Sequence, residues 1–452
     1  MAADGSTPEA SGAESVTSAF FEATPVYTFG RRPIVLGTSD LLRTHPPLME
    51  LTLAHHRAGG LVAEIKGSWR PELWLQSPIN IPWGPEGNRL AFENNSIVIG
   101  YLSVPTGVGE IVLGRQRVSL GPSPLTNILV SRQVPYVDGL LYTVNLGRWS
   151  MTHLLATLDN RRAAGDLAVP FARDGYDWGI TTILLSSRRF VWSAAALELG
   201  IGAQTIISRN YNAFQAGDVL PVFSIHNAYP GNNNLLITFD GTYAITDELS
   251  AYAAVGFDDI DAGMFGIADD EIPTIWAWFL GVDAARQTRH GQAAVTAEVG
   301  STHYLWGSFE DEYPLSRSIY RMRADGLHRQ MPLNSPFGPA RLWFLAEGSV
   351  DLTGSLRLAP KLLLLAGDPD VDLVSLPYAP RETRREFLLL RGTGVLSWDA
   401  HPSATLSLAP GFDYTDETFH PSLSLGAVWR TTFEWRQSST AGGPPADKLP
   451  SY

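Results

Sequence analysis

The feature that most constrains the fold is an alternation of apolar and polar residues that recurs along the chain. It is clearest in residues 234–261, where two alternating runs flank a Thr-Asp-Glu turn. In the first run Leu235, Ile237 and Phe239 share one parity, and Asp240 lies on the other. Side chains of a strand point alternately to opposite faces, so this spacing predicts strands with one apolar and one polar face. The two runs together predict an antiparallel hairpin.

The same alternation recurs elsewhere and is strongest near the C-terminus. It is seen in residues 61–70, 292–302, 341–352, 403–414 and 422–435. We count about 16 to 18 such segments, a number within the range of membrane barrels. The sequence therefore predicts an all-β protein.

The lengths of the connections help to distinguish a membrane-spanning β-barrel from a water-soluble all-β protein. After the first run, short and long connections alternate: the short ones are 246–248, 287–291, 353–354 and 399–402, and the long ones are 258–273, 303–338 and 367–386. Outer-membrane barrels have tight turns on the periplasmic side and extended external loops. We therefore predict a transmembrane antiparallel β-barrel of about 16–18 strands in the bacterial outer membrane. A water-soluble all-β protein is the alternative.

Tryptophans near the predicted strand ends fit this interpretation. Trp276 and Trp278 are expected near an outer end, and Trp398 and Trp435 near inner ends. Membrane proteins carry belts of aromatic residues at both interfaces with water. No stretch approaches the roughly 18 uninterrupted apolar residues of a membrane helix, so the chain is expected to span the membrane with strands.

The composition limits which partners and which cellular compartment are plausible for the chain. The 452-residue chain has a formal net charge of -13, which gives a nucleic-acid partner little electrostatic support. It has no Cys, which excludes disulfides and thiolate metal sites and is compatible with an oxidising compartment. We expect a flexible leader over residues 1–30, a barrel over 31–436 with a short N-terminal periplasmic segment, and a polar tail over 437–452. An export signal is expected to have been removed.

On the barrel interpretation the polar parity faces the lumen and carries charges of both signs. The predicted lumen charge network is Asp240, Asp283, Glu298, Glu347, Asp351, Arg357, Lys361, Arg391, Arg430 and Glu434. Interleaved charges with bulky inward residues such as Phe279 and Trp343 favour a plugged lumen crossed by ion pairs. The alternative is that these charges line a water-filled channel.

The sequence contains no motif for catalysis. A nucleophile elbow, a His-Glu-x-x-His run, a phosphate loop and a dinucleotide fingerprint are all absent. We expect a non-enzymatic protein without a cofactor or a metal site. The acidic segment 258–271 offers carboxylates of the kind that calcium binds, without the EF-hand spacing, so calcium binding there stays open.

Basic residues cluster in two of the predicted external loops. One cluster is Arg381, Arg384 and Arg385, and the other is Tyr320, Arg321, Arg323, His328 and Arg329. Guanidinium groups bind carboxylates through paired hydrogen bonds, and aromatic faces pack on sugar rings, so the clusters are candidates for holding an acidic polysaccharide. The alternative is that these arginines pair with nearby acidic residues or with anionic lipopolysaccharide.

Residues 113–136 resemble the capsule assembly protein Wzi family of outer-membrane barrels. The matching positions are Gly114, Arg115, Gly121, Pro122, Leu129, Ser131 and Pro135, and a weaker likeness covers residues 326–340. The chain departs from the family pattern at Leu120, Ser123, Arg132 and Gln133. The resemblance implies a plugged 18-stranded barrel that binds capsular polysaccharide at the cell surface.

The expected function is therefore binding or organising a surface, capsular-type polysaccharide through extracellular loops. The expected partners are outer-membrane lipid and lipopolysaccharide or another surface glycan, with the oligomeric state left open. The alternative is an outer-membrane porin or a substrate-specific channel or transporter.

Overall fold

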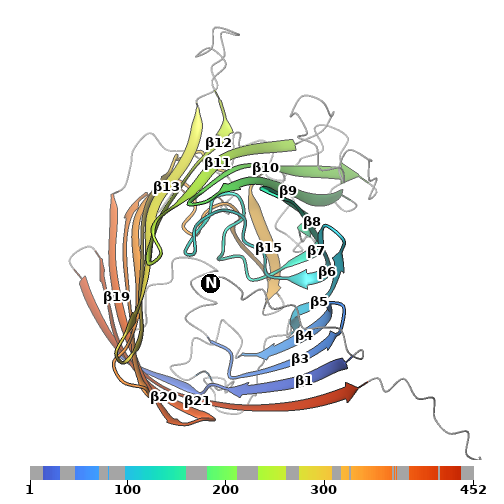
Figure 1. Ribbon diagram of the computed structural model, residues 1–452. Coiled ribbons are helices and arrows are strands. Elements are labelled where there is room, and N and C mark those ends of the chain that lie inside the picture. Colours follow the sequence, from blue (N-terminus) through green and yellow to red (C-terminus); the bar gives the residue numbers. More distant parts are fainter. Residues whose placement is uncertain are drawn as a thin grey trace, which may run out of the picture.

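The protein is almost entirely β-strand in the parts that its structure, a computed structural model, describes (Figure 1). These parts are residues 14–30, 46–70, 80, 97–158, 181–210, 233–260, 274–307, 317–324, 327–368, 371, 373, 386–415 and 418–438. They contain no helix long and apolar enough to cross a membrane. The strands are β1 (Glu14–Ala23), β2 (Val26–Gly30), β3 (Met49–Arg57), β4 (Leu61–Trp69), β5 (Ile97–Thr106), β6 (Gly109–Gln116), β7 (Val137–Leu146), β8 (Trp149–Leu158), β9 (Thr181–Ala194), β10 (Leu197–Asn210), β11 (Asn233–Thr246), β12 (Leu249–Asp259), β13 (Ile275–Thr288), β14 (Gly291–Thr302), β15 (Ile319–Ala324), β16 (Leu327–Pro332), β17 (Arg341–Asp351), β18 (Leu356–Gly367), β19 (Phe387–His401), β20 (Ala404–Thr415) and β21 (Thr418–Ser438).

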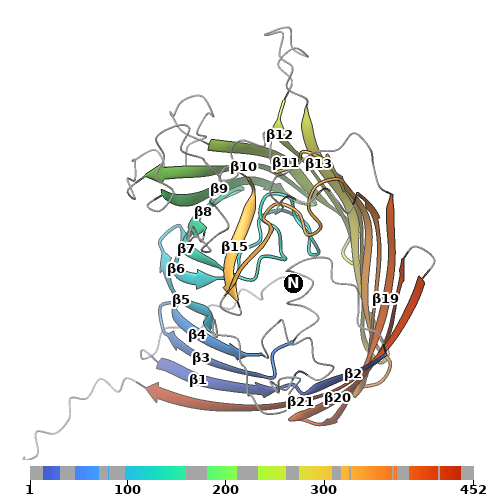
Figure 2. The same cartoon turned by 180° about the vertical axis from the view of Figure 1, so that it is seen from behind.

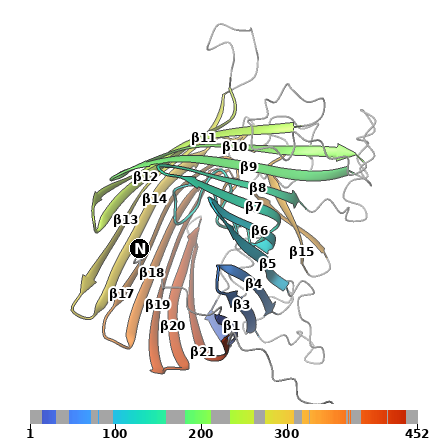
Figure 3. The same cartoon turned by 45° about the vertical axis from the view of Figure 1, so that its right-hand side comes forward.

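All strands except β15 and β16 form one antiparallel sheet that closes on itself. The sheet has 19 strand segments, but β1 and β2 follow one another along β21 and occupy one position in the wall, so the barrel has 18 strands. Short turns join every second pair of strands, such as β11 to β12 and β13 to β14, and the strands run side by side around the wall (Figure 3). The predicted fold class, a transmembrane antiparallel β-barrel of about 16–18 strands, is confirmed.

Barrel closure corrects one predicted boundary. β1 pairs with β21 from Glu14↔Ser438 to Ala23↔Trp429, and its other edge pairs with β3. The expected leader of residues 1–30 is therefore wrong from Glu14 onward. β1 was missed because its small Ser, Thr and Ala side chains give only weak alternation, whereas its place is fixed by backbone pairing on both edges. At the other end, β21 continues two residues into the expected tail of residues 437–452.

The two faces of the wall follow the predicted parity. On β11, Phe239 is 48% exposed on the outer face while its neighbours Thr238 and Asp240, which point to the lumen, are 2% and 8% exposed. The predicted hairpin of residues 234–261 is confirmed by the pairing of β11 with β12. Trp276, Trp398 and Trp435 are exposed on the outer face near strand ends, and Trp278 is half-buried. The apolar parity thus faces outward, as a lipid-exposed wall requires.

Two connections turn into the lumen, where they appear inside the ring from both ends of the barrel (Figures 1 and 2). The first is residues 117–136, between β6 and β7. The second is the described part of residues 303–340, between β14 and β17, which includes the β15–β16 hairpin. Their apolar side chains form a buried core with the inner wall; Ile128, Trp306 and Leu333 are all buried. We call these two segments the plug. The predicted external loop 303–338 is thus in large part an internal structure.

Candidate functional site

Glu298 on β14 anchors the first plug segment to the wall. Its Oε1 accepts hydrogen bonds from Thr126 Oγ1 at 2.5 Å and from Trp343 Nε1 at 3.1 Å, and its Oε2 accepts one from Ser123 Oγ. The carboxylate is 1% exposed. A buried carboxylate needs compensating partners, and here they are neutral donors. Glu298 was predicted to face the lumen and does so, but it holds the plug instead of joining an ion pair.

Asn334 joins the second plug segment to the first and to the wall. Its Nδ2 donates to the Leu129 carbonyl oxygen at 2.6 Å and to Gln204 Oε1 on β10 at 2.5 Å. Nearby, the Ser131 backbone N–H donates to the Leu333 carbonyl oxygen at 2.8 Å. The two segments that carry the family likeness, 113–136 and 326–340, therefore meet inside the lumen. Alternation does not reveal Asn334, because it lies outside the strands.

Two wall glycines make room for plug side chains. A Cβ atom at Gly202 would lie 2.6 Å from Leu129 Cδ2, and one at Gly256 would lie 2.9 Å from Trp306 Cη2. Separations this short exclude a larger residue unless the plug moves. The inner wall is shaped to the plug at these points.

The positions that match the family motif belong to the plug and to the strand leading into it. Gly114 and Arg115 lie on β6; Gly121, Pro122, Leu129, Ser131 and Pro135 lie in the first plug segment. Arg115 donates to Asp138 at 2.7 and 2.8 Å and stacks 4.1 Å from the centroid of the Tyr136 ring. Gly121 has φ +141°, and a Cβ there would strike Asn127. The motif therefore describes a lumen-filling element.

The predicted lumen charges form pairs along the wall and do not cross the lumen. The pairs are Arg189–Asp240 (2.5 Å), Arg391–Asp413 (2.7 Å), Arg357–Asp351 (2.7 Å), Arg430–Glu22 (2.8 Å), Arg436–Glu434 (3.4 Å) and Lys361–Glu347, and Asp283 accepts from Thr296 Oγ1 at 2.5 Å. The prediction missed the partners Arg189, Asp413, Glu22 and Arg436. Four of these pairs join inward residues on adjacent strands, which face each other across one strand spacing. Arg189 reaches Asp240 across β10, and Arg436 pairs with Glu434 on its own strand, β21, so all six pairs form along the wall.

The basic clusters are only partly visible. Arg381, Arg384 and Arg385 lie outside the described residues. Arg321 and Arg323 lie on β15, and His328 and Arg329 on β16; the structure describes these strands but not these side chains. Tyr320 is buried, and its ring packs edge-on against Tyr136 at 6.2 Å between centroids. Burial also raises the pKa of Tyr320 well above its ordinary value. The expectation that Tyr320 stacks on a sugar is wrong, because the plug encloses it.

The acidic segment 258–271 is described only to residue 260. Asp258 is buried, and its Oδ2 accepts a hydrogen bond from the backbone N–H of Gly307 in the plug at 2.8 Å. Within the described ranges, no group of three or more His, Asp or Glu side chains is placed to hold a metal ion. Asp258 therefore binds the plug. Residues 261–271 lie outside the described part of the chain, so calcium binding there stays a prediction.

A polar cluster on the outward parity of β7 to β9 was not foreseen. His153 contacts Tyr142 OH through Nδ1 and Ser186 Oγ through Nε2, each at 3.0 Å, and Arg188 Nη2 donates to Ser186 Oγ at 2.8 Å. A serine bonded to a histidine with a third residue on the other ring nitrogen is the arrangement of nucleophilic catalysis. Here His153, Ser186 and Arg188 are all 0% exposed, so the geometry supports a structural polar cluster.

The closed antiparallel wall, with an apolar outer face and a polar lumen that two inward segments enter, defines an outer-membrane β-barrel. No protein-family model matches the chain, and no curated protein matches it in sequence. Among solved structures it is similar to Wzi of Escherichia coli, with a TM-score of 0.55 and 15% identity over 91% of this chain and 84% of that one. It also aligns with OpdQ of Pseudomonas aeruginosa (TM-score 0.44, 9% identity, 93% and 98% covered) and with a loop-deleted OmpT of Vibrio cholerae (TM-score 0.38, 8% identity, 92% and 99% covered). At such identities the likeness is one of fold.

Proposed function

We propose that this outer-membrane barrel binds or organises a surface polysaccharide through its external loops and catalyses no reaction. The observation that carries the proposal is the plug that occupies part of the lumen. Ile128, Leu129 and Trp306 of the plug are buried, and they pack against the inner wall. A barrel with a plug in its lumen favours a function carried out by the external loops. Wzi, whose fold is similar, is described as a carbohydrate-binding β-barrel involved in group 1 capsule assembly.

The candidate binding groups are the arginines of the connection between β18 and β19. Arg381, Arg384 and Arg385 follow one another closely in a chain that is acidic overall, with net charge -13. Paired hydrogen bonds from guanidinium groups favour carboxylates, so the proposed ligand is a polysaccharide that contains uronic acids. Binding should weaken with salt, because exposed charges are screened.

The test is a triple variant, Arg381→Gln, Arg384→Gln and Arg385→Gln. We expect it to lower the affinity of the purified barrel for polygalacturonate by about tenfold or more, since each charge-assisted hydrogen bond contributes about 1.5–3 kcal/mol. The matched control is Arg286→Gln with Arg289→Gln, two exposed arginines at the short-turn end. Equal affinity in all three proteins, with the barrel intact by its electrophoretic mobility, would remove these arginines from the proposal.

A specific channel is the second candidate, and one observation favours it. On the wall from β17 to β21 the side chains of Arg357 and Arg430 are 62% and 43% exposed, although they lie on the inward parity. Charged side chains that reach water line channel walls. Steady stepwise currents from inserted wild-type protein in a planar bilayer would favour the channel, and silence would favour the binding protein.

A further inference from the structure

The outer wall carries a line of small residues and prolines at one level of the sheet. Gly348 on β17, Pro360 on β18, Gly394 on β19 and Pro410 on β20 share one register line. Pro360 pairs with Gly394, but pairing is interrupted between β17 and β18 after Glu347↔Lys361 and between β19 and β20 after Thr393↔Gly411. Proline has no N–H to donate to a ladder. Two gaps in the ladder therefore lie on one register line, on either side of the continuously paired β18 and β19.

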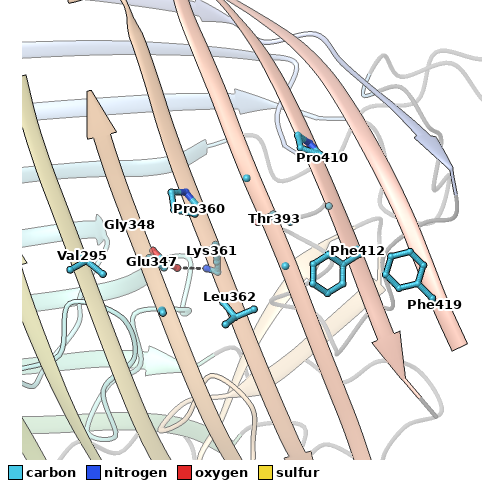
Figure 4. Close-up of a pocket in the computed structure, with 14 residues that line it drawn as sticks. Val295, Glu347, Gly348, Pro360, Lys361, Leu362, Thr393, Pro410, Phe412 and Phe419 are labelled. Carbon is cyan, nitrogen blue, oxygen red and sulfur yellow. Dashed lines mark hydrogen bonds and ion pairs between the residues drawn. The ribbon is translucent and has the colours of Figure 1, made fainter. Parts of the chain in front are cut away.

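A hollow opens along this line. It measures about 530 Å³ and is lined by Val295, Pro360, Leu362, Pro410 and Phe412, with Phe419 at its end (Figure 4). Phe412 stacks on Phe419 with 5.7 Å between ring centroids. Gly394 forms part of the floor: a Cβ added there would meet no atom within 4 Å.

The hollow faces the bilayer. The residues that form its sides share the parity of exposed outward residues such as Leu362 and Leu408, whereas Glu347 and Lys361 pair on the lumen side behind it. It crosses from β14 to β21, five strand spacings or about 24 Å. Strands of such barrels are tilted by about 35–45°, so a line across them rises through the membrane by roughly 15 Å, about half of the hydrocarbon core and thus the depth of one leaflet. Its aromatic end lies where β20 and β21 join at the loop end, and so at the outer leaflet.

We infer that this hollow is a binding site for one acyl chain of an outer-leaflet lipid, which in this membrane is lipopolysaccharide. The surrounding medium is hydrocarbon, so only a chain that fits the groove better than bulk lipid gains from it, through dispersion contacts with the proline and phenylalanine walls. The hollow extends across several strands of the wall, which suits an extended chain. The inference rests on the barrel and its orientation and is independent of polysaccharide binding.

The test fills the floor of the hollow. Gly394→Leu places a side chain in open space, so the barrel should fold and the site should be blocked. The matched control is Gly100→Leu, an outward glycine on β5 whose added Cβ would have only Ile97 within 4 Å, at 3.8 Å. Native mass spectrometry after extraction in mild detergent reports the lipid retained per barrel. We expect retained lipopolysaccharide in wild type and in Gly100→Leu, and about tenfold less in Gly394→Leu.

Other outcomes overturn the inference. Equal lipid in all three proteins would mean that the hollow holds nothing specific. A retained glycerophospholipid would contradict the outer-leaflet assignment, and a dimer that only Gly394→Leu dissociates would assign the hollow to a second copy. If Gly394→Leu does not fold, Phe419→Ala removes one wall instead, and undiminished lipid in that variant would equally refute the site.

Discussion

Glu298 shows how a single buried carboxylate determines what the lumen contains. It accepts hydrogen bonds from two side chains of the plug and one of the wall, all on neutral donors. Replacing it with alanine leaves three buried donors without their acceptor. Each such group costs about 1–3 kcal/mol, so the effect should exceed that of an ordinary surface substitution.

We therefore expect Glu298→Ala to lower the free energy of unfolding by about 3 kcal/mol or more. Urea unfolding of the barrel in detergent micelles measures it. Glu434→Ala is the control, because its side chain and that of its partner Arg436 are both exposed. Equal midpoints for the two variants would contradict the anchoring role of Glu298.

The Arg391–Asp413 pair makes a second residue-scale prediction. Arg391 donates from Nε to Asp413 Oδ1 at 2.7 Å and from Nη2 to Asp413 Oδ2 at 2.9 Å, and both residues are buried. Removing one partner of a buried pair costs about 3–5 kcal/mol, because the other charge remains desolvated. Asp413→Asn should therefore lower the unfolding midpoint in urea. Asp351→Asn, which disrupts a pair with an exposed arginine, should shift it far less.

The alternation along the strands predicts that these side chains face the lumen, but it does not predict which side chains bond to each other. Ser123 lies 175 residues from Glu298, and its position depends on the path of an irregular segment. A two-residue period carries no information about such a segment. The arginine clusters show the same limit, since Tyr320 appeared external by its place in a long connection and is enclosed in the plug.

The plug is the element that strand patterns describe least well. Its apolar residues, such as Leu129 and Leu333, follow neither a strand nor a helix period, and they are buried by contact with each other and with the wall. The length of the connection between β14 and β17 was visible in the sequence. The sequence does not show that this connection turns into the lumen, because that depends on the wall glycines that make room for it.

Crowding the wall should displace the plug. A side chain at Gly256 would press on Trp306 and Ile128, so we expect Gly256→Val to loosen both plug segments while the strands remain paired. Limited proteolysis should then cut within residues 117–136 or 317–340, and we expect the wild-type protein to resist cleavage there. Gly100→Val, on the outward face, is the matched control. Identical cleavage patterns would mean that the plug does not depend on this contact.

At the scale of the whole molecule, the sequence predicts a β-barrel but does not predict which strand closes it. Alternation and connection length together predict a barrel, because only a closed sheet leaves no unpaired backbone in lipid. The strand that completes the barrel, β1, was predicted to be part of the leader, because its small Ser, Thr and Ala residues and its adjacent Phe20 and Phe21 give only weak alternation. Only the pairing of β1 with β21, at the opposite end of the chain, shows that β1 closes the barrel.

Truncation tests the closure. Removing residues 1–13 leaves every described strand intact, so the barrel should retain its folded electrophoretic mobility without heating. Removing residues 1–30 deletes β1 and β2 and leaves β21 and β3 without a shared neighbour. We expect that variant to lose the folded band and its protection from protease in liposomes. A folded band for the longer truncation would show that β21 and β3 can close the wall directly.

Glu22 and Arg430, which bond across β1 and β21, are 408 residues apart in the chain. The seam of the barrel can therefore form only after nearly the whole polypeptide has been synthesised and delivered to the membrane. Until then the sheet has two open edges, which would pair with other chains or leave backbone groups bare in lipid. Closure of the barrel must accordingly be a late event, and the chain must be kept from aggregating until its last strand is available to pair with its first.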